Sequence, residues 1–260
     1  MIDKQNEQDF RQIAIDKVGV KGIRYPLTVL DRARTTQSTV AEISMYVGLS
    51  HQSRGTHMSR FLEVLNEHGN ELHIDSIPQI LAKTREVLQS HSAYLEITFP
   101  YFLTKTAPVS KQQGLMDYQI AFQASQDNNR TDIEMIVTAW ITTLCPCSKA
   151  ISQSGAHNQR GRVTVHVRTR KDVWFEDIIE IIEQSGSGPL YSLLKRVDEK
   201  YVTEYAYNTP VFVEDVVRNC ALKLNANPDI IWYKVEAENA ESIHNHNAYA
   251  CITSANRANE

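Results

Sequence analysis

Two stretches of the sequence decide the expected fold: GTHMSR at residues 55–60 and GAHNQR at residues 155–160. Both match the pattern Gly-x-His-x-x-Arg, and their first glycines lie 100 residues apart. Each stretch belongs to a polar loop after a strand-like segment, and we expect a helix and further strands to follow each. This internal repeat predicts two similar α+β modules in tandem. We expect an N-terminal extension at 1–37, a first module at 38–144, and a second module at 145–260.

Hydrophobic spacing outside these loops supports the same interpretation. Residues 162–168 (RVTVHVR) alternate between apolar and polar side chains, which is typical of a strand. Residues 77–88 repeat apolar side chains at helical spacing and carry Pro78 in the first turn. Residues 211–224 place five apolar side chains on one helical face. Further strands are expected at 22–36, 38–48, 94–103, 116–124, 133–143, 230–238 and 248–254, a further helix at 174–184, and regular structure at 61–65.

The composition is that of an ordinary globular protein, and it excludes several classes. The 260 residues are 42% hydrophobic, which is too hydrophobic for a disordered chain. The 27 Lys and Arg residues against 31 Asp and Glu give a net charge of −4, and without a basic run we expect no nucleic-acid partner. No stretch approaches the ~18 uninterrupted apolar residues of a membrane-spanning helix. The polar N-terminus and the four cysteines predict a cytoplasmic protein without a disulfide framework.

The densest group of reactive side chains lies at 144–162, LCPCSKAISQSGAHNQRGR. It contains the thiols Cys145 and Cys147 and the imidazole of His157, and a thiolate with an imidazole is a natural ligand pair for a divalent metal. A buried structural turn around Pro146 is an equally good explanation. A redox dithiol is a third alternative, although that chemistry usually uses Cys-x-x-Cys.

Two acidic positions and a second histidine group are also candidates. In a strand, His244 and His246 of the segment 241–247 (ESIHNHN) would face the same side, which suits one metal, or one ligand and one acid–base group. A solvated polar loop is the alternative. Glu199 is a carboxylate that would complete a metal shell. Glu214 lies in the first turn of an expected helix, where the helix dipole favours a carboxylate and where acids usually serve as caps.

The first Gly-x-His-x-x-Arg loop offers His57, Ser59 and Arg60. Cations and hydroxyl groups of this kind suit phosphate oxygens, and an ordinary surface loop is the alternative. No P-loop, GxGxxG or GxSxG pattern accompanies these residues.

Four motifs together resemble the GTP cyclohydrolase type IB family, over nearly the whole chain. They are RGTHMSRF (54–61), LCPCSKAISQSGAHNQRG (144–161), YNTPVFVEDVVR (207–218) and ESIHNHNAYA (241–250). The resemblance implies an α+β fold of two tandem tunnelling-fold (ββααββ) modules, an antiparallel sheet with helices on one face. It further implies that the sheets of several subunits assemble into a barrel, as a homotetramer with active sites at the subunit interfaces.

The resemblance also implies a reaction and a cofactor. GTP and water would give formate and 7,8-dihydroneopterin triphosphate, the first step of folate biosynthesis, through attack of a metal-activated water on C8 of guanine. Each site would hold one divalent ion, Mn²⁺, Zn²⁺ or Fe²⁺. The implied metal ligands are Cys147, His157, Glu199 and His244, so the second module at 145–260 would carry most of the metal site.

The remaining motif residues take catalytic and substrate-binding roles by the same resemblance. Cys145 would lie beside the metal as a second thiol, and the choice of Cys147 over Cys145 as ligand stays open. His246 is the acid–base candidate, and Glu214 is the purine anchor. The triphosphate would be bound by Lys149, Arg160, Arg60 and Ser59, with His57 from a neighbouring subunit.

Two other functions compete with this one. A tunnelling-fold nitrile reductase would use a nucleophilic cysteine and NADPH, and the His and Glu set disfavours it. A non-catalytic purine- or pterin-binding module with a structural metal is the second. We expect the other two cysteines, Cys220 and Cys251, to be buried packing residues.

Overall fold

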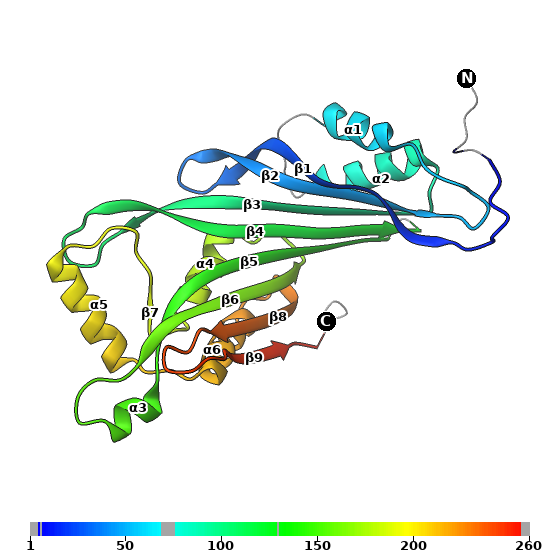
Figure 1. Ribbon diagram of the computed structural model, residues 1–260. Helices are drawn as coiled ribbons and strands as arrows, with labels where there is room; N and C mark the ends of the chain where they lie inside the picture. The colour runs from blue at the N-terminus through cyan, green and yellow to red at the C-terminus, as the bar shows by residue number, and fades with distance from the viewer. Residues whose placement is uncertain (1–4, 6, 69–75, 129, 256–260) are drawn as a thin grey trace. The chain divides into compact units, whose positions relative to one another are not determined.

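The computed structural model describes residues 5, 7–68, 76–128 and 130–255 (Figure 1). In these residues the chain forms nine strands and six helices, and the strands pair in the order β1-β2-β3-β4-β5-β6-β8-β9, with β7 paired to β5. The strand pairs with a given register are antiparallel. This confirms the expected α+β class. Within the described part of the chain, no helix is both long and apolar enough to span a membrane.

The order strand–strand–helix–helix–strand–strand occurs twice along the chain. The first set is β1 (Ile15–Asp31), β2 (Thr35–Leu49), α1 (Met58–Glu67), α2 (Ile77–Leu88), β3 (Ser92–Thr106) and β4 (Gln113–Asp127). The second is β5 (Arg130–Leu144), β6 (Asn158–Thr169), α4 (Phe175–Glu183), α6 (Val213–Asn225), β8 (Ile230–Asn239) and β9 (Ala248–Thr253). Three further elements are added to the second set: α3 (Pro146–Ile151), β7 (Gly188–Pro189) and α5 (Arg196–Asn208).

By internal contacts the chain divides into two compact units. Unit 1 comprises Met1–Pro100 and Ala121–Met135, and unit 2 comprises Tyr101–Ile120 and Ile136–Glu260. The division passes through β3, β4 and β5. The modules at 38–144 and 145–260 stay a prediction. Their bounds differ from those of the repeated element order, in which β1 belongs to the first set and β5 begins the second.

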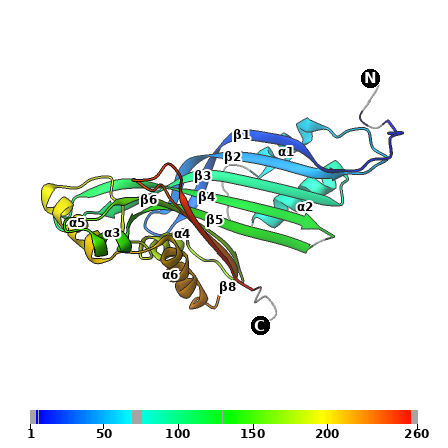
Figure 2. The same cartoon turned by 60° about the horizontal axis from the view of Figure 1, so that its bottom comes forward.

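In unit 1, two helices cover the buried face of the strands. Along β2 the side chains alternate, and the inward residues Ala41, Ile43, Met45 and Val47 are almost fully buried. Helices α1 and α2 lie against each other and against β1 and β2 (Figure 2). Strand β1 lies within the expected N-terminal extension, and its register shifts between Val20 and Ile23, around a glycine with positive φ.

In unit 2, α4 and α6 pack against each other and against the sheet formed by β5, β6, β8 and β9 (Figure 2). Helix α6 buries the apolar face that the sequence predicted, with Cys220 added to it. Cys251 is exposed, so the expectation that it is a buried packing residue is wrong. The reason is its place on β9, a strand at the end of the sheet order whose alternate residues are exposed.

A buried carboxylate fixes α5, a helix that the sequence did not predict. Asp198 is fully buried, and its Oδ1 accepts from the backbone N–H groups of Val109 and Ser110, both at 2.8 Å. Its Oδ2 accepts from the Ser110 hydroxyl and, at 2.8 Å, from the N–H of Lys195. The start of α5 is therefore fastened to the turn between β3 and β4.

Candidate active site

The loop between β5 and β6 folds back on itself through its cysteine and histidine. Cys145 caps α3, and its Sγ accepts from the N–H of Ser148 at 3.5 Å. The N–H of Cys145 donates to the carbonyl of His157 at 3.1 Å. The N–H of His157 donates to the Ser148 hydroxyl at 3.1 Å. Cys147 is exposed and Cys145 half-buried, so the two thiols have different environments.

The ring of His157 has a defined orientation. Its Nδ1 lies 3.0 Å from Oε1 of Gln159 and 3.6 Å from Oε2 of Glu241. Both oxygens are acceptors, so the ring proton belongs on Nδ1, and Nε2 keeps the lone pair that a metal or a proton requires. The motif at 241–250 begins with Glu241, but the sequence predicted no role for this carboxylate.

The two C-terminal histidines lie in the turn between β8 and β9 and are exposed. The rings of His244 and His246 stack with centroids 4.9 Å apart and an interplanar angle of 15°. The N–H of His244 donates to the carbonyl of Glu241 at 3.2 Å. This segment is therefore an exposed turn, which corresponds to the alternative of a solvated polar loop and not to a strand.

Glu199 and Glu214 are exposed carboxylates in the first turns of α5 and α6. The capping role at α6 belongs to the neighbouring residue, because Oδ2 of Asp215 accepts from the N–H of Phe212 at 3.0 Å. Glu214 is therefore not needed as a cap.

The proposed ligand types suit a divalent ion, since a thiolate, two imidazoles and a carboxylate provide mixed S, N and O donors. In the part of the chain that the structure describes, however, no three His, Cys, Asp or Glu side chains gather closely enough to hold a metal. The metal-ligand set of Cys147, His157, Glu199 and His244 therefore stays a prediction. Within the described residues of a single chain, these donor atoms do not form a cluster of three.

The triphosphate candidates fall into two groups. His57, Ser59 and Arg60 belong to unit 1, where Arg60 Nη1 donates to the carbonyl of Val87 at 3.0 Å and links α1 to α2. Lys149 and Arg160 belong to unit 2. The Lys149 ammonium donates to the carbonyl of Tyr207 and lies 4.2 Å from the centroid of its ring. Arg160 is exposed.

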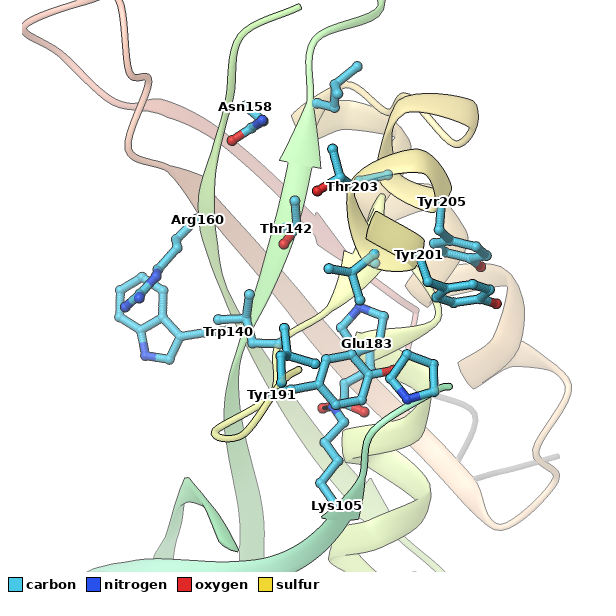
Figure 3. A pocket seen from close by; sticks show the side chains of 18 of the residues that line it. Lys105, Trp140, Thr142, Asn158, Arg160, Glu183, Tyr191, Tyr201, Thr203 and Tyr205 are labelled. Atoms are coloured by element: carbon cyan, nitrogen blue, oxygen red, sulfur yellow. Dashed lines mark hydrogen bonds and ion pairs between the residues drawn. The ribbon is translucent and has the colours of Figure 1, made fainter. Parts of the chain in front are cut away.

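Unit 2 also contains a cavity of about 1040 Å³ (Figure 3). Of the candidate site residues, Arg160 lines it. Five other lining residues belong to the motifs: Leu144, Gly155, Ala156 and Asn158 of 144–161, and Tyr207 of 207–218. The rest of the lining includes Lys105, Trp140, Glu183, Tyr191, Tyr201 and Tyr205, which come from segments far apart in sequence and had no predicted role.

Comparison with known proteins gives a consistent result. A family model described as type I GTP cyclohydrolase folE2 matches residues 1–250. The chain is 59% identical over 252 residues to GTP cyclohydrolase FolE2 of Syntrophus aciditrophicus, covering 97% of this chain and 99% of that protein. It is 53% identical over 252 residues to the FolE2 of Fervidobacterium nodosum, covering 97% of each chain.

Among solved structures, the chain resembles uricase from Arthrobacter globiformis, with a TM-score of 0.54, 9% identity and 94% of each chain covered. Urate oxidase from Bacillus subtilis 168 gives a TM-score of 0.50 at 8% identity, covering 92% of this chain and 98% of that one. At such low identity these likenesses concern the fold alone. They confirm the expected tunnelling fold.

Proposed function

The chain belongs to the type I GTP cyclohydrolase FolE2 family, and on this premise we propose that it converts GTP and water to formate and 7,8-dihydroneopterin triphosphate, the first step of folate biosynthesis. The observation that carries the proposal is the match over residues 1–250, a span that contains all four motifs. The relatives are named as GTP cyclohydrolases, and neither the nitrile reductase nor the non-catalytic module receives support.

The exposed carboxylate of Glu214 supports recognition of guanine. A carboxylate accepts well from a ring N–H and a neighbouring amino group, and guanine presents both on one edge. A site built for these donors rejects adenine, which lacks that pair. Because Asp215 caps α6, Glu214 is available for this role.

We also propose that the site holds one divalent ion, Mn²⁺, Zn²⁺ or Fe²⁺, through Cys147, His157, Glu199 and His244. When bound, such an ion supplies Lewis acidity and lowers the pKa of water toward neutrality. The available Nε2 of His157 and the exposed thiol of Cys147 support this ligand set. As the family resemblance implies, we propose that the site forms at an interface of a homotetramer.

The other site residues would hold the triphosphate and move protons. Lys149 and Arg160 provide cations in unit 2, and we assign His57, Ser59 and Arg60 to the same triphosphate from a neighbouring subunit. Opening the guanine ring at C8 requires proton transfers, for which we propose His246 and Cys145. A cytoplasmic location agrees with four free cysteines, because reducing compartments keep thiols reduced.

The test uses purified protein stripped of metal, then resupplied with Mn²⁺, Zn²⁺ or Fe²⁺ and incubated with GTP. We expect metal-dependent release of formate together with a product that shows pterin fluorescence after oxidation. ATP in place of GTP is the matched control and should give no turnover. Absence of both products with every metal would contradict the proposed function.

A further inference from the structure

The main chain of His157 is fixed at both of its polar groups. Its N–H donates to the Ser148 hydroxyl and its carbonyl accepts from the N–H of Cys145, both at 3.1 Å. These two bonds set the position of the backbone but leave the imidazole free to turn about its side-chain torsions. A neutral imidazole also carries its proton on either nitrogen. The groups that orient the ring and select its tautomer are therefore the side chains around it.

Gln159 makes the shorter of the two polar contacts to this ring. Its Oε1 lies 3.0 Å from Nδ1 of His157, against 3.6 Å for Oε2 of Glu241. The side chain of His157 is 13% exposed, so little of the ring is open to water that would replace these contacts. Gln159 is the second residue of β6, and the regular strand fixes its backbone.

A buried hydroxyl group holds the other end of the Gln159 amide. Nε2 of Gln159 donates to Oγ1 of Thr143 at 3.0 Å, and Thr143 is fully buried on the neighbouring strand β5. Cγ2 of Thr143 lies 3.3 Å from the position that a Cβ would take at Gly161, so its methyl group is directed toward this glycine. A β-branched side chain with a packed methyl group has a fixed hydroxyl position. Thr143 therefore anchors the amide.

Glu241 decides which way the amide faces. Amides and hydroxyl groups both donate and accept, so Gln159 and Thr143 alone are compatible with either tautomer of His157. In the reversed arrangement the amide would donate to Nδ1 and accept from the Thr143 hydroxyl. The ionised carboxylate of Glu241, which only accepts, would then face the lone pair of Nδ1. The observed arrangement avoids this repulsion, because Nδ1 carries the proton and both neighbouring oxygens accept.

We propose that Gln159 is a positioning residue for the reaction. Its amide, anchored by Thr143, holds the imidazole of His157 in the Nδ1–H form and leaves the lone pair on Nε2 for the chemistry of the site. Gln159 acts through His157 and has no contact with the reacting atoms in this role. The use of Nε2 in the reaction rests on the proposed function, whereas the orientation and tautomer of the ring do not.

The test measures the tautomer of His157 in the metal-free, full-length protein by ¹⁵N NMR at about pH 8.5, where an ordinary imidazole is neutral. Long-range ¹H–¹⁵N correlations distinguish a protonated ring nitrogen from an unprotonated one, and His157→Ala identifies the signals among those of nine histidines. We expect the Nδ1–H form in wild type. Gln159→Leu should lower the ratio of the Nδ1–H to the Nε2–H form by about fivefold, since one hydrogen bond of ordinary strength is lost.

Substitutions of Thr143 test the anchor separately. Thr143→Val keeps the shape of the buried side chain and removes the hydroxyl, so the ratio should fall in the same direction by about twofold. Thr143→Ser retains the hydroxyl and should restore the wild-type ratio. The matched control Thr138→Val removes another hydroxyl from β5, whose Oγ1 lies 3.1 Å from that of Thr164 on β6. It should leave the ratio unchanged, because this hydroxyl bonds to Thr164 and not to Gln159.

The rate of formate release in the metal-loaded enzyme connects the tautomer to the reaction. Gln159→Leu should lower this rate by about tenfold, and Thr138→Val should change it by less than about twofold. An unchanged tautomer ratio or an unchanged rate in folded Gln159→Leu would overturn the proposal. If Gln159→Leu does not fold, equal ratios in Thr143→Val and Thr143→Ser would overturn it instead. Absence of turnover in wild type would contradict the proposed function and leave the NMR result on His157 valid, so the two failures are distinguishable.

Discussion

Nδ1 of His157 lies 3.6 Å from Oε2 of Glu241, and both side chains are mostly buried. The carboxylate comes from the loop that also carries His244 and His246, and its own carbonyl accepts from the N–H of His244. Glu241 thereby links the two histidine-bearing segments of the candidate site. A carboxylate behind an imidazole fixes the orientation of the ring and its tautomer.

Glu241→Gln should therefore lower metal affinity or turnover by about 10- to 100-fold without unfolding the chain. Metal content after dialysis and the rate of formate release are the measurements. Glu204→Gln, which changes an exposed carboxylate of α5, is the matched control and should behave as wild type. Wild-type metal content and rate in Glu241→Gln would show that Glu241 does not orient His157.

Substitutions of the neighbouring acids Glu214 and Asp215 in α6 should have different effects on turnover and on stability. Glu214→Ala should retain metal and stability but lose GTP turnover, whereas Cys147→Ala and His157→Ala should each lose both metal and turnover. Asp215→Ala should lower the free energy of unfolding by about 1 kcal/mol through loss of its capping hydrogen bond, with an unchanged KM for GTP. Turnover retained in Glu214→Ala would remove the purine-anchor assignment.

The Lys105 ammonium donates to Oε1 of Glu183, and this pair, whose side chains are each 15% exposed, should show strong non-additivity in stability. Glu183→Leu alone leaves a nearly buried ammonium without its partner and should cost about 3 kcal/mol. The double variant Lys105→Met/Glu183→Leu removes both charges and should be more stable than Glu183→Leu alone. Urea unfolding of Lys105→Met, Glu183→Leu and the double variant gives the coupling energy between the two side chains. If the changes in the free energy of unfolding of the two single variants add up to that of the double variant, the proposed coupling is wrong.

Asp198 should make the fold sensitive to acid. Burial alone raises the pKa of this carboxyl, but hydrogen bonds from Ser110, Lys195 and Val109 outweigh it and hold the pKa well below its ordinary value of 3.8. The folded pKa is depressed, so the associated stability is present above pH 3.8 and is lost as the pH falls below it. Urea unfolding at about pH 5 and pH 3 should show a steep loss in wild type and a smaller one in Asp198→Asn. Equal losses in the two proteins would contradict this role.

The four cysteines should react with a thiol reagent at very different rates. Burial raises the pKa of Cys220 to about 11, so this thiol should react only after unfolding. Cys147 and Cys251 are exposed and should react quickly in the folded, metal-free protein, ahead of the half-buried Cys145. Cys147→Ser should remove one rapidly reacting equivalent, and mass spectrometry of labelled peptides identifies each site.

Local sequence patterns predicted those elements whose own side chains specify them. Helix α2 begins and ends at the residues expected, because Pro78 occupies its first turn and its apolar residues repeat at helical spacing. Helix α5 was not predicted, because its buried residues are only Asp198 and Ala206, and no apolar stripe marks it. The position of α5 depends on the hydrogen bonds that Asp198 accepts from Val109 and Ser110, which lie 89 and 88 positions earlier in the chain. The periodicity of residues within one segment does not indicate such long-range contacts.

In the candidate site, too, local sequence patterns predicted some residues, whereas those that act through long-range contacts were missed. The motifs identified the reactive side chains of the loop before β6 and of the β8–β9 turn, since unusual residue types at short spacing are visible in a sequence. The partner of His157 was not identified, because Glu241 reaches it from 84 positions later. The cavity was missed for the same reason, since Lys105 and Glu183 lie 78 positions apart.

The first turn of α6 assigns two adjacent acids to different tasks, because Asp215 completes the backbone hydrogen bonding and Glu214 extends into solvent. With Glu214 as the proposed purine anchor, helix capping and base recognition depend on different codons at this point. A single codon change at position 214 leaves the helix cap of Asp215 in place. The proposed base-recognition role is therefore open to change by selection or design while the scaffold stays intact.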